Sequence, residues 1–398
     1  MRKVGWIVCV LLLGAIAPFV LYLNNSRETT SRTPQAPIQS SEENPAPTAL
    51  VSEAEALFEG DRAAQQALAA EVIEDIQRGI SAEDFNTGSA RFDGEWAVGS
   101  YQMAVLGLGQ VILTHHELRD DYLPMMAQSI DRLLAPTMNA FGTEAWGEEG
   151  LATLESANGH AYLGYTNLAL SMLRLHQPDT PFAQINDQLT EAFVRRLEAA
   201  PHGIIETYPQ EAYPADLAAV VASIGLYDRA TGKDHQPLLD SLLRQFQQNW
   251  VDSETGLVFQ AVNAASGIPT DVPRASGTVL SAYFLSFVDA DLAQALFNSV
   301  VDSQKVEFSG LVGIREYPVG QEGAGDVDSG ELIQGISPSA TAFALGGARL
   351  VGDRVLYETI YDTIQILGTS PIEATQGATL LDSPLSRAIL LAMLTANP

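Results

Sequence analysis

The sequence predicts an all-α domain in which about six helical hairpins form an (α/α)6 toroid. Apolar residues recur at helical spacing in about twelve segments, without the alternation typical of strands. The connections between these segments are alternately short and long. Helix pairs joined in this way stack with short turns on one rim and long loops on the other, and about six of them close into a ring. An open superhelical array is the alternative.

The first predicted element is an N-terminal membrane anchor over residues 1–23. Arg2 and Lys3 precede about twenty mostly apolar residues without a charge, which is long enough to span a bilayer. Positive charge at this end favours a cytoplasmic N-terminus, so the signal-anchor helix predicts a single-pass protein with its toroid domain outside, periplasmic or extracellular. Cleavage as a signal peptide after residues 15–17 is the alternative, and Pro18 disfavours it.

Residues 24–50 are predicted to be a disordered linker, because Ser, Thr, Pro, Glu and Asn dominate them. The remaining residues, 51–398, form the toroid domain, and no second linker divides them. The only cysteine, Cys9, lies in the anchor, so the domain has no cysteine for a disulfide or a metal site. The net charge of −28 disfavours nucleic acid and anionic lipid headgroups as partners.

The predicted helices of the domain fall into two sets. Those entered from long loops are rich in Gly, Ala and Ser, as is typical of helices packed on several sides. They are expected to form the inner ring over residues 97–116, 156–176, 213–231, 273–288, 337–352 and 382–396. The other segments are 51–79, 120–135, 182–200, 235–250, 289–303 and 353–367. Helix dipoles and unpaired amides at the inner N-termini then converge on one cavity, where we expect the ligand site.

The best candidate chemistry lies in residues 203–234. Turn formers and β-branched residues, with Tyr208 and Tyr213 among them, form a long loop that enters the predicted helix 213–231. Asp216 stands near the start of that helix, on the rim where the inner N-termini meet.

Several segments resemble the linalool dehydratase/isomerase family. The similar segments are 199–234, Asn158-Gly159-His160 with the apolar helix after it, 251–256, and 326–330 leading through Ser337 to 341–343 and Gly352-Asp353. They cover roughly 140–355 in the same order and with nearly the same spacing. The resemblance implies an α/α toroid of six helix pairs that performs cofactor-free acid/base chemistry on a monoterpene alcohol in a cavity at the inner rim.

The family's active-site histidine matches His160 by position, whereas its two active-site cysteines fall on Thr207 and Asp216. The cavity position therefore carries a carboxylate, and His160 and Asp216 are the predicted catalytic pair. The helix dipole favours ionised Asp216 and burial opposes it. Two structural alternatives stay open: Asp216 as a helix cap and His160 as a hydrogen-bonded packing residue.

Aromatic residues supply further candidates for substrate binding. Tyr208 and Tyr213 are expected to line the cavity. Trp96 and Trp146 stand near long loops, where they either stack on a ligand or fill the core.

Two charged residues complete the predicted site. Arg274, at the start of an inner helix, either neutralises a ligand carboxylate or pairs with an acid. Asp328 lies in the longest loop, 304–336, which we interpret as a lid or cavity floor.

Two functional classes remain. The sequence contains no Gly-rich phosphate loop, His-Glu-x-x-His pair or Gly-x-Ser-x-Gly elbow, so neither a cofactor nor a metal is expected. The first class is an anchored extracytoplasmic lyase, isomerase or hydrolase acting on a small neutral organic molecule. Hydrolysis of an oligosaccharide belongs here by analogy of fold. The second is a non-catalytic glycan- or lipid-binding protein of the cell envelope. A homo-oligomer is compatible with both.

Overall fold

The computed structural model describes residues 52–368 and 382–397. The predicted anchor, the linker and Cys9 lie outside the described residues, as does most of the last predicted loop, 368–381.

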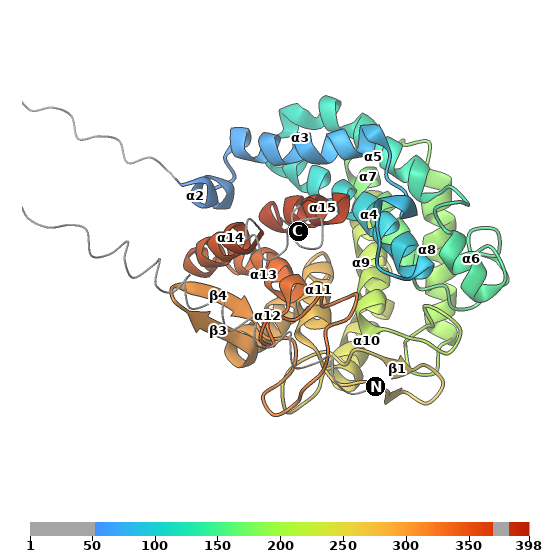
Figure 1. Cartoon of the computed structure of the whole chain (residues 1–398). Helices are drawn as coiled ribbons and strands as arrows, with labels where there is room; N and C mark the ends of the chain where they lie inside the picture. Colours follow the sequence, from blue (N-terminus) through green and yellow to red (C-terminus); the bar gives the residue numbers. More distant parts are fainter. Residues whose placement is uncertain (1–51, 369–381, 398) are drawn as a thin grey trace, which may run out of the picture. The chain divides into compact units, whose positions relative to one another are not determined.

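Six inner helices form a closed ring, as the alternating connections predict. They are α4 (Ala90–Thr114), α7 (Leu163–His176), α9 (Pro214–Thr231), α11 (Ala275–Leu285), α13 (Pro338–Leu350) and α15 (Pro384–Leu394). Each helix contacts the next one in this order, and α15 contacts α4 (Figure 1). Because an open superhelical array would leave its first and last helices apart, the closed ring establishes the toroid.

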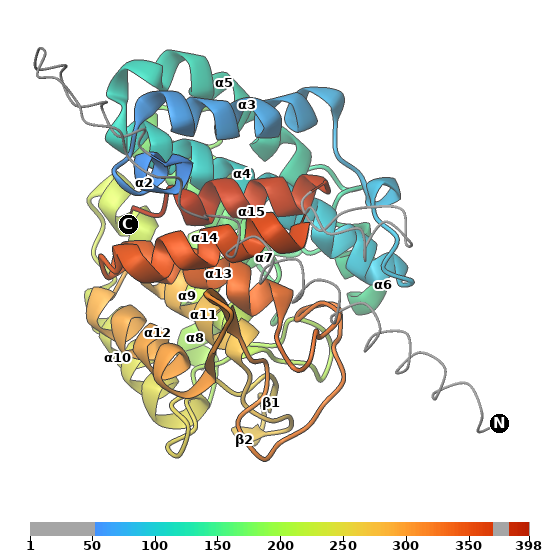
Figure 2. The same ribbon diagram turned by 60° about the vertical axis from the view of Figure 1, so that its left-hand side comes forward.

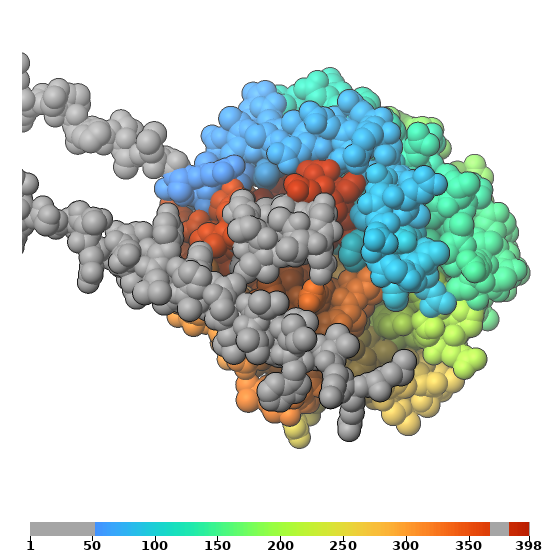
Figure 3. All heavy atoms as spheres, viewed as in Figure 1, coloured from blue at the N-terminus to red at the C-terminus, as the bar shows by residue number. Residues whose placement is uncertain are grey.

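Six outer helices cover this ring. They are α3 (Arg62–Arg78), α5 (Arg119–Leu133), α8 (Ala183–Ala199), α10 (Gln236–Gln245), α12 (Ala290–Gln304) and α14 (Arg354–Gly368). Five of them pack on the inner helix that precedes them, and α3 packs on α15. Figure 2 shows α15 lying alongside α4 and α13, and in Figure 3 the blue helices of the N-terminal end touch the red C-terminal ones. The two ends of the domain therefore share one core.

Small residues let the inner helices approach one another closely. A Cβ atom on Gly164 of α7 would lie 2.5 Å from a methyl group of Val220 on α9, and one on Gly107 of α4 would lie 2.6 Å from Leu391 on α15. Atoms do not approach this closely in folded proteins, so both glycines are required where they stand. The Gly and Ala content that marks the inner helices in the sequence has this steric cause.

The structure corrects two predicted helix starts. The helix predicted at 97–116 begins at Ala90, because the side chain of Asp93 accepts hydrogen bonds of 2.8 Å from both the backbone amide and the hydroxyl of Thr87 and fixes the chain before the helix. The helix predicted at 156–176 begins only at Leu163, because Gly159 and His160 have positive φ angles of 75° and 56°, which end any helix before them.

Other short elements lie outside the twelve-helix ring. The predicted helix 51–79 is broken at Gly60 into α2 (Glu53–Phe58) and α3, and α6 (Ala140–Trp146) lies in a predicted loop. The short helical turns are Ala82–Asp84, His116–Leu118 and the π-helical Phe246–Trp250. The sequence interpretation contained no strands, but two antiparallel hairpins occur in long loops, β1 (Val262–Asn263) with β2 (Ile268–Pro269) and β3 (Lys305–Phe308) with β4 (Leu311–Ile314). Strands of two to four residues are too short to show alternation in a sequence.

One helix in the described part of the chain, α4, is long and apolar enough to cross a bilayer. Most of its apolar window, 83%, is buried inside the domain, so its apolar character is that of a core helix.

Candidate active site

Three carboxylates from different parts of the ring interact at the N-terminal ends of the inner helices. Glu95 lies in the second turn of α4, Asp216 in the first turn of α9, and Asp328 in the loop that precedes α13. The charges of Asp216 and Asp328 both raise the pKa of Glu95, and the charge of Asp216 raises that of Asp328. Because like charges repel, these carboxyl groups bind protons more tightly than isolated ones do.

Asp216 accepts more side-chain hydrogen bonds than either of the other two carboxylates. The hydroxyl of Thr207 donates a hydrogen bond of 2.6 Å to one of its oxygens, and the hydroxyl of Tyr165 donates one of 2.7 Å to the other. Burial raises its pKa, and these two hydrogen bonds oppose the rise because they stabilise the ionised form. The N-cap residue of α9 is Tyr213, and no side chain makes a capping hydrogen bond there, so Asp216 does not act as the helix cap.

Glu95 holds its proton at neutral pH. Burial raises its pKa to about 8, and the charges of Asp216 and Asp328 add to the rise. A hydrogen bond of 2.5 Å from the Tyr208 hydroxyl to its Oε1 and the charge of Arg91 oppose the rise without cancelling it. A carboxyl group in this state can donate a proton to a substrate near pH 7.

Asp328 faces the other two acids from the loop before α13. Burial and the charges of Asp326 and Asp216 together raise its pKa to about 7, against the charge of Arg274. Its side chain is solvent-exposed, so solvent weakens the effect of burial, whereas the repulsion by the two aspartates still raises the pKa. The amide of Gln260 donates a hydrogen bond of 2.9 Å to its Oδ2.

The residues that hold Asp216 and Glu95 are consecutive in the chain. Thr207 binds Asp216 and Tyr208 binds Glu95, so one short segment connects α9 with α4. A tight turn follows, in which the Tyr208 carbonyl accepts from the Glu211 amide at 2.9 Å. Adjacent residues of one segment therefore bind the two carboxylates.

His160 stands three residues before the first residue of α7, Leu163. Its side chain is fully buried, its ring stacks on Trp146 at a centroid distance of 4.4 Å, and its Nε2 lies 3.3 Å from a Glu148 oxygen. Trp146 in turn donates a hydrogen bond of 2.9 Å to the Thr207 carbonyl. The structure thus joins His160 to Asp216 through two intervening residues and not by direct contact.

Burial lowers the pKa of His160, so its imidazole is neutral near pH 7. Among the described residues, its Nδ1 has no hydrogen-bond partner. In this position His160 supports Trp146 and, through it, the segment that holds Asp216. A direct catalytic role for His160 stays a prediction.

Tyr213 and Trp96 lie near the acids in the chain, since Tyr213 is the N-cap residue of α9 and Trp96 follows Glu95 on α4. Tyr213 is partly buried and donates a hydrogen bond of 3.0 Å to Glu211, and Trp96 packs edge-on against Phe85 at 5.7 Å. Trp96 also packs against the apolar core while keeping some exposed surface.

Arg274 forms ion pairs with Asp271 at 2.6 Å and with Asp326. Of the two roles that the sequence allows, the structure shows the pairing with acids. The pairs attach the loop that carries Asp328 to the start of α11.

Two site residues escape the sequence interpretation. Glu95 falls in the segment 80–96, which was expected to be a loop, and Tyr165 lies inside an apolar helix where a tyrosine indicates nothing special. Thr87 and Asp93, whose side chains are hydrogen-bonded at the start of α4, are the signal that would place Glu95 on the inner helix. No sequence pattern marks Tyr165, because its role depends on a hydrogen bond to Asp216, which is distant in the sequence.

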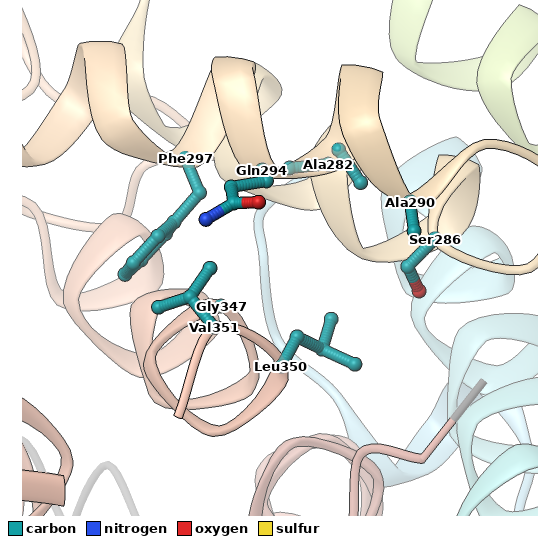
Figure 4. Close-up of a pocket in the computed structure, with 9 residues that line it drawn as sticks. Ala282, Ser286, Ala290, Gln294, Phe297, Gly347, Leu350 and Val351 are labelled. Atoms are coloured by element: carbon teal, nitrogen blue, oxygen red, sulfur yellow. The ribbon is translucent and has the colours of Figure 1, made fainter. Parts of the chain in front are cut away.

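The cavity drawn in Figure 4 lies elsewhere. It has a volume of about 100 Å³ between α11, α12 and α13, and its lining includes Ser286, Gln294, Phe297 and Gly347 but no titratable side chain. This cavity and the carboxylate rim are therefore separate features of the domain. Among the residues that the structure describes, no group of three His, Cys, Asp or Glu side chains is arranged to hold a metal ion.

Comparison with known proteins identifies the fold but no family. No protein-family model matches the chain, and no curated protein matches it. The chain is similar to the structure of the GH76A alpha-1,6-mannanase from Salegentibacter sp. HEL1_6, with a TM-score of 0.53 and 15% identity over 83% of this chain and 98% of the mannanase. An inactive variant of that mannanase with two aspartates replaced by asparagine, in complex with alpha-1,6-mannotriose, gives a TM-score of 0.52 and 14% identity over the same shares. At these identities the likeness shows a shared α/α toroid.

Proposed function

We propose that the domain is a glycoside hydrolase that cleaves a neutral oligosaccharide by acid/base catalysis with Glu95 and Asp216. The observation that carries this proposal is the difference in hydrogen bonding between two carboxyl groups that interact with each other. Burial and two like charges keep Glu95 protonated, with a pKa of about 8, whereas two hydroxyl donors stabilise the ionised form of Asp216 and limit the rise in its pKa that burial causes. Glycoside hydrolysis needs one acid and one carboxylate in this relation.

The roles follow from the hydrogen bonds. Tyr208 donates to Oε1 of Glu95, which leaves Oε2 to carry the proton. Glu95 gives that proton to the glycosidic oxygen as the bond from this oxygen to the anomeric carbon breaks. Asp216 supplies the negative charge at the anomeric carbon, and water adds to this carbon. Retention of the anomeric configuration would mean that Asp216 attacks directly and that ionised Glu95 then takes the proton of the water that releases it. Inversion would mean that Asp216 activates the water and takes its proton.

The charges of the rim favour a substrate without anionic groups. Arg91 is paired with Glu211 at 3.3 Å, and Arg274 with Asp271 and Asp326, so neither arginine is free to neutralise a ligand. Asp216 in its ionised form, and Asp328 when it is ionised, would repel a uronate or a phosphate. A saccharide hydroxyl, in contrast, both donates to and accepts from the groups present.

The mannanase supports the choice of first substrate. That enzyme is inactive when two aspartates are replaced, and its inactive form holds alpha-1,6-mannotriose. Alpha-1,6-mannotriose is therefore the first oligosaccharide to test, followed by other neutral oligosaccharides.

A non-hydrolytic reaction is the second candidate. The same acid and base would dehydrate or isomerise a neutral alcohol, as the resemblance to linalool dehydratase/isomerase implies. The substitution of Thr207 and Asp216 for the family's cysteines favours the glycoside reaction, because a pair of carboxyl groups is the usual equipment for it.

Product analysis tests both candidates. The full chain is incubated with alpha-1,6-mannotriose and, separately, with linalool, and products are identified by chromatography and NMR. We expect release of shorter sugars, lost in Glu95→Gln and in Asp216→Asn and kept in Asp120→Asn, whose carboxylate is 95% exposed on an outer helix. Cleavage that persists in the first two variants would refute the assignment, and conversion of linalool alone would select the second candidate.

We also propose that the domain lies outside the cytoplasmic membrane. The apolar run at residues 4–23 after Arg2 and Lys3 supports this location. Protease added to intact spheroplasts should digest the domain, and protection until the membrane is broken would contradict the proposal.

A further inference from the structure

Arg91 stands one helical turn before Glu95 on α4, so both side chains lie on the same face of that helix. Its guanidinium carbon lies 4.5 Å from the ring centroid of Tyr208, which is a cation–π distance. Its Nη1 lies 3.3 Å from a carboxylate oxygen of Glu211. Arg91 therefore contacts both residues that close the turn after Thr207.

This turn is strained and needs support. Gln210 has a φ angle of 70°, which is unfavourable for a residue with a side chain. The Tyr208 amide donates to the Glu211 carbonyl at 3.2 Å, and the Tyr213 hydroxyl donates to the Glu211 side chain at 3.0 Å. Arg91 adds an ion pair with Glu211 and a cation–π contact with Tyr208 to this turn.

The ion pair with Glu211 accounts for little of the effect that we assign to Arg91. Its side chain and that of Glu211 are 39% and 41% exposed, and pairs as exposed as this contribute little stability. The stacking on Tyr208 is different, because it acts on a residue that is itself buried and bonded to Glu95. The apolar part of the Tyr208 ring also packs near Tyr162 at 6.1 Å.

We propose that Arg91 is a positioning residue, which holds the Tyr208 hydroxyl on Oε1 of Glu95 and so decides which carboxyl oxygen carries the catalytic proton. The catalytic part rests on the proposed function. The positioning itself is measured on Glu95 without any turnover.

The direction of the effect follows from the groups that face Glu95. These are Arg91 on its own helix, Tyr165 on α7, Tyr208 in the turn, Asp216 on α9 and Asp328 in the loop before α13. Arg91 and the Tyr208 hydrogen bond lower the pKa of Glu95, and the two aspartates raise it. Loss of Arg91 removes its charge and releases Tyr208, so both consequences raise the pKa of Glu95.

A double-mutant cycle separates these two consequences. The protonation of Glu95 is followed by 13C NMR of labelled glutamate side chains in the full chain, with Glu95→Gln identifying the signal. We expect Arg91→Gln to raise the titration midpoint by about one pH unit, which corresponds to one hydrogen bond to a charged group. In the Tyr208→Phe background, the same substitution should give less than half of that shift, because the hydroxyl through which Arg91 acts is gone.

Two results would overturn the inference. Equal shifts in both backgrounds would mean that Arg91 acts only by its charge through space, and no shift in the wild-type background would mean that it is only structural. Arg91→Met, which keeps the apolar stem, replaces Arg91→Gln if the latter does not fold. A shift that follows expectation in a chain that cleaves no sugar would leave the positioning role standing and reject the proposed function. Cleavage of sugar without a shift in the titration midpoint of Glu95 would support the proposed function and reject the positioning role.

Discussion

Replacing Glu95 by Gln should remove activity and yet stabilise the domain. The pKa of Glu95 rises from 4.5 to about 8 on folding, so the folded chain holds a proton that the unfolded chain releases. Between these two values stability falls as pH rises, because the folded state binds more protons than the unfolded state. Below pH 4.5 the group is protonated in both states and costs nothing.

The magnitude follows from the same shift. Each pH unit above 4.5 lowers the free energy of unfolding by about 1.4 kcal/mol, so the wild-type chain loses about 3 kcal/mol by neutral pH. A Gln side chain never ionises, and its amide oxygen still accepts from the Tyr208 hydroxyl. We therefore expect Glu95→Gln to be as stable as wild type near pH 4.5 and up to about 3 kcal/mol more stable near pH 7.

Urea unfolding at several pH values between 4.5 and 8 measures this difference. Asp120→Asn is the control, because it also replaces a carboxylate by an amide but at a side chain that is 95% exposed on an outer helix. A variant that is less stable than wild type near neutral pH, or a difference that does not change with pH, would refute the raised pKa and with it the role of Glu95 as the acid.

Three further outcomes are expected. The kcat/KM on the cleaved sugar should fall about tenfold per pH unit above about pH 8, as Glu95 loses its proton, and a rate that is constant to higher pH would contradict this. Thr207→Val should lower kcat/KM at least about tenfold by removing a donor to Asp216, while Thr207→Ser keeps the hydroxyl and most of the activity; equal rates in the two variants would exclude the hydrogen bond as the cause. Gly164→Ala should lower the free energy of unfolding by about 1 to 3 kcal/mol, because its new methyl group meets Val220 at 2.5 Å, and an unchanged urea midpoint would mean that α7 and α9 can separate at no cost.

The ring was predictable because its signal extends over the whole chain. Alternating loop lengths and small residues on every second helix both follow from the packing of inner helices such as α7 and α9, where Gly164 meets Val220. Many weak local signals along the chain therefore predict the same ring of helices. The short hairpins β1–β2 and β3–β4 give no such repetition, and their pairing depends on contacts that the sequence does not display.

The candidate site was predictable in part. Asp216 stands out because it opens an inner helix, and Asp328 because it lies in the longest loop. Glu95 was missed through an error of seven residues in the start of α4, since the prediction began at residue 97 and the helix begins at Ala90. An error that hardly changes a fold can thus remove the acid from a site.

The segment Thr207-Tyr208 explains why the site can hold two carboxyl groups in different states. Asp216 receives hydroxyls from Thr207 and Tyr165, whereas Glu95 receives one from Tyr208 and faces two like charges. Since neighbouring residues of one segment hold both acids, a movement of this segment would change both environments together. The strained turn after Tyr208 and the arginine stacked on its ring keep that segment in place. The difference in proton affinity that the reaction needs is therefore a property of this loop as much as of the two helices that carry the acids.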